Sequence, residues 1–342
     1  MAAHQNDETA MKQALREARR GLGQTSPNPA VGAVLVVDGM VVARGHHRRA
    51  GGPHAEIECL RQFRKPVPKR AILYVTLEPC STEGRTGACT EAIVKAGVRQ
   101  LVIGAIDPNP RHAGQGIDLL TGAGVQVRTG VLADECSALN EAYNKWITTG
   151  LPFVIAKCGM SLDGRLTASP GETQWLTSAT ARRDARRLRA QVDAILVGAE
   201  TVRADNPRLT VRGQGSAKQP WRVVLSRSGK LPRHAKIFAD RFAGRTLVFR
   251  ETTMATLLRE LGSRGITSVL IEGGGEVLSQ ALDERVIDRA QVYVAPRLTA
   301  GPTLAFAGSG AGTTDEAMRL RDIRYEKIGD DIRITGYPVA VE

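Results

Sequence analysis

The sequence has few aromatic residues and no long apolar run. Aromatic residues make up 4% of the 342 positions, which is little for a protein that stacks single-stranded bases on aromatic side chains. The longest apolar stretch, residues 31–43, contains Asp38 and Gly39 and falls short of the roughly 18 residues of a membrane span. The N-terminal residues lack the order of a secretory signal. We therefore expect a cytoplasmic protein with no nucleic-acid partner and no membrane association.

Cysteine is also scarce. The chain has five cysteines, and an odd number in a chain of this length argues against a disulfide framework. Cys59, Cys136 and Cys158 each lie alone in an apolar pattern, as core cysteines do. Cys80 and Cys89 instead share a turn-rich segment, which leaves metal binding open for this pair.

Positive charge is in excess. The formal net charge is +12, which predicts anionic partners. Residues 182–212 contain arginine but no lysine, a bias that suits forked recognition of phosphate. A solvated helix face is the alternative for Arg182, Arg183, Arg186 and Arg187. With aromatic residues so few, the charge favours small phosphorylated ligands.

Apolar periodicity predicts alternating strands and helices in both halves of the chain. In the first half we expect helices, a hairpin turning at Asp38-Gly39 and a largely parallel sheet, from the segments 11–22, 33–43, 54–63, 72–77, 93–94 and 102–103. A helix over 133–146 leads to the turn-rich segment 148–152, where we place the boundary between domains 1–147 and 151–342. In the second half we expect strands at 153–157, 194–197, 222–225, 246–249, 269–271 and 292–294.

One group of residues is of the types that bind metal ions. His54 and Glu56 lie two residues apart at a helix start, and Cys80 and Cys89 follow after a strand. One imidazole and two thiolates suit catalytic zinc, which keeps a fourth position for water. The pattern H-x-E followed by P-C-x-x-C is typical of zinc nucleobase deaminases, although the cysteine spacing is wider here. A structural zinc site or coincidence stays open on spacing alone.

The motifs around these residues resemble the RibD family of bifunctional riboflavin biosynthesis enzymes. They are the segments 26–32, 51–56, 77–81, 84–90 and 107–110, together with His47. The resemblance implies a cytidine-deaminase-like three-layer domain that removes the 2-amino group of a phosphoribosylated diaminopyrimidinone. It also implies one zinc ion per chain on His54, Cys80 and Cys89, with Glu56 as general acid and base. Asn28 is then expected to contact the pyrimidine.

The chain departs from the family pattern in two places, at Thr82 and at Gly87-Ala88. The family usually has histidine where this chain has Thr82, and two prolines where it has Gly87-Ala88. Both departures lie between the cysteines, and the predicted zinc ligands are retained. Glycine frees backbone that proline restricts, so loop rigidity and substrate contact are the properties we expect to change.

The second half resembles the reductase domain of the same family, through residues 157–165, 175–178, 189–198, 201–212 and 272–274. The resemblance implies a dihydrofolate-reductase-like α/β domain in which NADPH reduces the ribosyl group to ribityl, with Lys157 in a catalytic role. Implied NADPH contacts are Gly159, Trp175, Thr201, Asp205, Ser226, Gly274, Gly275, Glu276, Val277, Leu278, Ser279 and Gln280. Implied substrate contacts are Thr173, Arg189, Leu209, Arg212 and Glu272.

Elementary chemistry agrees with part of this assignment. Gly273, Gly274 and Gly275 follow a strand and precede a helix, so their amides suit a pyrophosphate. The pattern G-x-G-x-x-G with its downstream acid is missing, which disfavours a Rossmann fold. Arg189 and Arg212 offer paired donors to phosphate.

Two other functions fit part of the sequence. A tRNA or other polynucleotide deaminase with an accessory domain would explain the charge and the zinc motif. A catalytically inactive binding protein would explain Thr82 and Gly87-Ala88. The metabolic enzyme explains both halves, and we expect it to act on a small phosphorylated pyrimidine as a homo-oligomer, a dimer or a tetramer.

Overall fold

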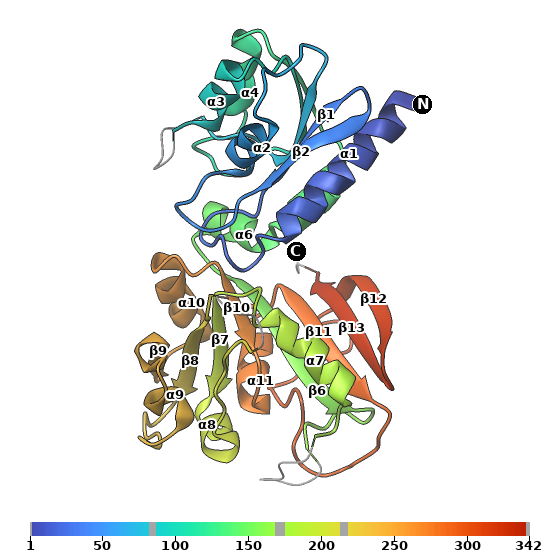
Figure 1. Cartoon of the computed structure of the whole chain (residues 1–342). Helices are drawn as coiled ribbons and strands as arrows, with labels where there is room; N and C mark the ends of the chain where they lie inside the picture. The colour runs from blue at the N-terminus through green and yellow to red at the C-terminus, as the bar shows by residue number, and fades with distance from the viewer. Residues whose placement is uncertain (1, 82–86, 168–174, 213–217, 340–342) are drawn as a thin grey trace. The chain divides into compact units, whose positions relative to one another are not determined.

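The computed structural model describes residues 2–81, 87–167, 175–212 and 218–339, without the side chains of residues 2–5. The chain forms two compact units, Met1–Gly150 and Leu151–Glu342. Each has its own sheet (Figure 1), and each has its own hydrophobic core.

The sheet of the first unit is mixed. Its strand order is β2-β1-β3-β4-β5, where the strands are β1 (Gly32–Val37), β2 (Met40–His46), β3 (Ile72–Leu77), β4 (Gln100–Ala105) and β5 (Gln126–Thr129). Strands β3, β4 and β5 are parallel, whereas β1 is antiparallel to β2 and β3. The predicted hairpin is confirmed, with positive φ at Asp38 (51°) and Gly39 (77°). Because this tight turn reverses the chain, β1 and β2 are antiparallel, and the sheet has fewer parallel strand pairs than predicted.

Helices cover both faces of this sheet. Successive strand residues point to opposite faces, so Val34 packs in a cluster with α1 (Ala2–Arg19) while Leu35 packs on the other side. The second side is covered by α2 (Ala55–Phe63), α3 (Cys89–Lys95) and α4 (Gln115–Gly122). The predicted three-layer arrangement is confirmed.

The helix predicted over 133–146 is divided in two. The structure has α5 (Ala133–Leu139) and α6 (Glu141–Thr149), with Asn140 between them. The Asn140 side chain accepts a hydrogen bond from Ala30 N (2.8 Å) and donates one to Ala30 O (3.0 Å). This buried pair of bonds satisfies the Ala30 backbone, and it holds Asn140 where a continuous helix would have run.

The second unit contains a larger sheet of order β12-β13-β11-β6-β10-β7-β8-β9. Its strands are β6 (Phe153–Ser161), β7 (Ala194–Gly198), β8 (Trp221–Ser226), β9 (Thr246–Arg250), β10 (Ser268–Ile271), β11 (Arg289–Ala295), β12 (Leu320–Ile328) and β13 (Asp331–Pro338). The strands from β6 to β11 are parallel, and β12 and β13 add an antiparallel hairpin at one edge. That hairpin was not predicted, because β12 is exposed along almost its whole length and lacks an alternating apolar pattern.

Different helices cover the two faces of this sheet. The main core contains α10 (Met254–Ser263) and α11 (Gly275–Asp283), and α7 (Ala179–Leu188) packs through Ala181 and Ala185 against Tyr293. The remaining helical segments are α8 (Ala199–Asp205), α9 (Lys236–Ala239) and η1 (Ala243–Arg245). Loops leave the carboxyl ends of the parallel strands together, the usual place for ligands in such sheets.

None of the helices in the described part of the chain combines the length and the apolar composition that a membrane span requires.

Candidate active sites

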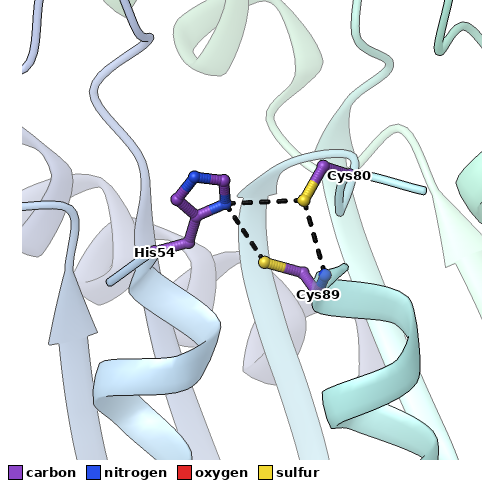
Figure 2. Close-up of side chains that lie close together, drawn as sticks. All are labelled: His54, Cys80 and Cys89. Carbon is purple, nitrogen blue, oxygen red and sulfur yellow. Dashed lines mark hydrogen bonds between the residues drawn. The ribbon is translucent and has the colours of Figure 1, made fainter. Parts of the chain in front are cut away.

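The three predicted zinc ligands lie together in the first unit. His54 precedes α2, Cys80 follows β3, and Cys89 begins α3. Their ligand atoms all lie within 4.8 Å of one another. His54 Nδ1 is 3.2 Å from Cys89 Sγ and 3.5 Å from Cys80 Sγ, and Cys89 N donates to Cys80 Sγ at 3.4 Å (Figure 2). One nitrogen and two sulfurs converging in this way match the donor chemistry of a zinc site.

The thiols and the imidazole influence one another. The hydrogen bond from the Cys89 thiol lowers the pKa of Cys80 to about 4, which favours the thiolate. The hydrogen bond with Cys80 raises the pKa of His54. The hydrogen bond between the two cysteines also raises the pKa of Cys89, so the pair favours one thiolate and one thiol, and a metal, which binds cysteine as the thiolate, would displace the remaining proton.

Glu56 lies in the first turn of α2, beside His54. Its side chain is 3% exposed, and its Oε2 atom is buried without a hydrogen-bond partner among the described residues. Burial raises the pKa of this carboxyl to about 7. A buried carboxylate oxygen without a partner is uncommon in folded proteins. This one is available to a molecule that enters the site.

His47 supports the predicted substrate residue Asn28. Its Nδ1 is 2.9 Å from Pro53 O, and its Nε2 is 3.3 Å from Asn28 Nδ2. The Nδ1 atom therefore donates to the carbonyl and Nε2 accepts from the amide. The His47 ring also lies edge-on to that of His54, with centroids 5.1 Å apart. His47 belonged to the recognised motif but was not predicted as a site residue, because a lone histidine has no pattern that shows its partners.

The segment between the cysteines is described only in part. Thr82 lies outside the described residues. Gly87 has φ 76°, a left-handed conformation that glycine adopts easily and proline, restricted to φ near −65°, cannot. The chain therefore enters α3 along a path that a proline at this position would not permit.

Three predicted residues of the reductase come together in the second unit. Arg189 donates from Nε to Glu272 Oε1 (2.8 Å) and from Nη2 to Glu272 Oε2 (2.5 Å). Burial opposes ionisation of Glu272, but the charges of Lys157 and Arg189 outweigh it and lower the pKa of this carboxyl. The guanidinium predicted to hold phosphate thus donates to a carboxylate along the edge formed by Nε and Nη2.

The predicted cofactor turn is close to Thr201. Gly274 has φ 75° and precedes α11, and a Cβ atom there would lie 3.3 Å from Thr201 Oγ1. A Cβ atom on Gly275 would lie 2.4 Å from Leu304 O. The turn therefore needs glycine for its conformation and for close packing. Backbone amides without side chains therefore lie at the start of α11, an arrangement that suits the pyrophosphate of NADPH.

Several other predicted cofactor residues use their side chains within the protein. Val277 and Leu278 are buried in the core, Ser279 Oγ donates to Gly275 O (2.6 Å) and accepts from Ala307 N (2.6 Å), and Gln280 Nε2 donates to Glu284 Oε1 (2.8 Å). The Val277 and Leu278 amides also bond within the protein, donating to Gly274 O at 3.1 and 3.2 Å. Glu276 is an exposed exception, 3.4 Å from Arg227 Nη2.

The remaining predicted residues have varied surroundings. Trp175 is 64% exposed, and the Arg182 guanidinium lies 5.2 Å from its ring centroid. Burial raises the pKa of Asp205. Ser226 Oγ accepts from Gly229 N at 3.0 Å, and Leu209 is buried with φ 49°. Gly159 faces Thr177, Arg212 is exposed, and Thr173 lies outside the described residues.

Both halves of the chain match known families. Residues 4–105 match the cytidine and deoxycytidylate deaminase zinc-binding region, and residues 152–334 match the RibD C-terminal domain. The chain is 36% identical to the riboflavin biosynthesis protein RibD of Aquifex aeolicus, over 96% of this chain and 97% of that protein. It is 40% identical to RibD of Escherichia coli, over 85% and 88% of the two chains.

The chain belongs to the RibD family. Two solved structures agree with this membership. Acinetobacter baumannii RibD superposes with a TM-score of 0.91 at 36% identity, over 98% of this chain and 100% of that one. A Thermotoga maritima protein, described as a diaminohydroxyphosphoribosylaminopyrimidine deaminase and 5-amino-6-(5-phosphoribosylamino)uracil reductase, gives 0.90 at 33%, with the same shares covered.

Membership in the RibD family establishes the general activity. The chain is a bifunctional deaminase and reductase of riboflavin biosynthesis, with zinc as the cofactor of the deaminase and NADPH as that of the reductase. Its substrate is a small phosphorylated pyrimidine. The predicted cytidine-deaminase-like fold and RibD reductase fold are confirmed. Relatives of nearly full length favour this function over a polynucleotide deaminase.

Proposed function

We propose that residues 1–147 hydrolyse the 2-amino group of 2,5-diamino-6-(5-phosphoribosylamino)pyrimidin-4(3H)-one and that residues 151–342 then reduce the ribosyl group of 5-amino-6-(5-phosphoribosylamino)uracil. The observation that supports the first step is the approach of His54 Nδ1 to both cysteine sulfurs, at 3.2 and 3.5 Å. The observation that supports the second is the close pairing of Arg189 with Glu272 beside Lys157.

In the deaminase site, His54, Cys80 and Cys89 would hold zinc, which would supply Lewis-acid activation of a water molecule near neutral pH. Glu56 takes the proton from the attacking water and delivers it to the pyrimidine and its leaving amine. Its unpartnered Oε2 atom supports this role. Asn28 recognises the amide edge of the ring through its carbonyl oxygen, since His47 accepts from its amide nitrogen.

In the reductase site, NADPH supplies the hydride, and the protein holds the two reactants together. The turn at Gly274 and Gly275 binds the pyrophosphate through backbone amides, and Thr201 lies beside it. Glu272, kept ionised by its cationic neighbours, accepts hydrogen bonds from the ribose hydroxyls. Lys157 polarises the carbonyl of the opened sugar. Arg212 and Arg189 bind the substrate phosphate.

A coupled assay tests the proposal. Purified zinc-loaded protein is given the diaminopyrimidinone phosphate and NADPH, and ammonia release is followed together with NADPH oxidation. We expect both signals. Chelation of the metal is expected to stop ammonia release while oxidation of NADPH with pre-deaminated substrate continues, because the cysteine ligands lie in the first unit only. Loss of both activities on chelation would contradict this division.

We also propose that the chain is a cytoplasmic homo-oligomer. Support for the oligomer comes from the edge strand β12 and its neighbour β13, which expose Ile323 (42%), Tyr325 (69%) and Ile332 (48%). A long exposed edge strand with apolar side chains is suited to pairing with a second copy. We expect a dimer or tetramer in sedimentation velocity, and a smaller species for Tyr325→Glu. A monomeric wild-type protein at micromolar concentration would refute this proposal.

A further inference from the structure

Glu78 lies two residues before the ligand Cys80 and has no role in the mechanism above. Its side chain is buried, with 4% exposed. Oε2 accepts hydrogen bonds from Asp107 N (3.3 Å) and Gly114 N (3.1 Å), and Oε1 accepts one from Gly116 N (3.0 Å). One carboxylate thus binds amides from the loop after β4 and from the start of α4. An anion at a helix start is also stabilised by the helix dipole.

The start of α4 packs closely against the turn that carries Cys80. A Cβ atom on Gly116 would lie 2.3 Å from Pro79 O, so only glycine allows α4 to approach this carbonyl. On the other side, Glu78 N donates to Ala105 O (2.9 Å) and Thr90 N donates to Cys80 O (3.3 Å). The turn is therefore held from β4, α3 and α4, and the carboxylate supplies the attachment to α4.

We propose that Glu78 is a positioning residue of the zinc site, one that sets the place of Cys80 Sγ relative to His54 and Cys89 by fixing its turn against α4. The inference rests on the proposed zinc ligands. It does not require Glu78 to touch substrate or metal. Residues behind metal ligands are known to alter metal affinity or activity by roughly ten- to a hundredfold.

The test is Glu78→Gln in the full-length protein loaded with Co²⁺. Glutamine keeps the size of the side chain but turns an NH2 group toward at least one backbone N–H, which breaks that bond. We expect altered thiolate-to-cobalt absorption bands, Co²⁺ binding weakened by roughly ten- to a hundredfold, and a fall in kcat for deamination with a smaller change in KM. Tyr143→Phe is the matched control, because Tyr143 anchors the same loop through Asp107 Oδ1 (3.1 Å) without touching the ligand turn.

One result would overturn the role of Glu78, and a different result would overturn the zinc ligands on which that role rests. A Glu78→Gln protein with the cobalt spectrum and metal affinity of Tyr143→Phe would show that Glu78 serves stability alone. A wild-type protein without thiolate-to-cobalt bands would instead refute the proposed ligands. If Glu78→Gln does not fold, hydrogen exchange of wild-type protein decides: metal binding should increase protection of the Gly114 and Gly116 amides, and unchanged protection would refute the proposal.

Discussion

Replacing Glu56 with glutamine is expected to lower the rate of ammonia release by about 10²- to 10⁴-fold, the usual contribution of a general acid or base. Glutamine fits the same buried space beside His54 but cannot accept a proton from water. The protein should still bind one zinc ion, because the three ligands are unchanged. It should also oxidise NADPH at the wild-type rate when given pre-deaminated substrate.

The control for this experiment lies in the same helix. Glu58→Gln removes a carboxylate that pairs with Arg48 at 3.1 Å, two residues beyond Glu56. Ammonia release should stay close to wild type in this variant. Turnover in Glu56→Gln equal to that of Glu58→Gln, at full zinc content, would rule out the proposed proton transfer.

Glu272→Gln is expected to have the largest effect in the second unit. It removes the charge that faces the Arg189 guanidinium in a pair whose side chains are 20% and 6% exposed. Removing one partner of a buried ion pair leaves the other charge uncompensated, at a typical cost of about 3 kcal/mol or more. Urea unfolding should show this loss of free energy in the second unit. NADPH oxidation should fall at least tenfold, about 1.4 kcal/mol of transition-state stabilisation.

An exposed pair provides the comparison. Glu260 on α10 and Arg264, the residue that follows this helix, are 2.5 Å apart with side chains 46% and 45% exposed, so Glu260→Gln should change the free energy of unfolding by less than about 0.5 kcal/mol. Deamination should be unaffected in both variants. If Glu272→Gln were as stable and as active as Glu260→Gln, the pair would have neither a structural nor a catalytic role.

Part of the signal for the predicted zinc ligands is local, and the family resemblance supplied the full set. His54 and Glu56 are two residues apart at a helix start, and Cys80 lies three residues after the end of a buried strand. The hairpin at Asp38-Gly39 was predictable from a local signal as well, since a two-residue turn depends on the backbone preferences of its own residues. Alternation of strands and helices indicated α/β units, and the family resemblance added which folds these are.

The partners of charged and polar side chains were not predictable. Arg189 was expected to bind phosphate, and its carboxylate partner Glu272 lies 83 residues further along the chain. Glu78 binds amides 36 and 38 residues away. Asn140 interrupts a predicted helix because it bonds to the backbone of Ala30, 110 residues earlier. No periodicity or spacing reports contacts of this kind.

The sequence by itself determined which residue types carry the chemistry, the order of the two units and most of their strands and helices. These depend on backbone preferences and on apolar periods of a few residues, which short segments contain in full. Only the tertiary structure decided which charges neutralise one another, where a helix stops and what holds the turn that carries Cys80. These follow from packing distant segments together, because a buried polar group must find its partner wherever the fold places one.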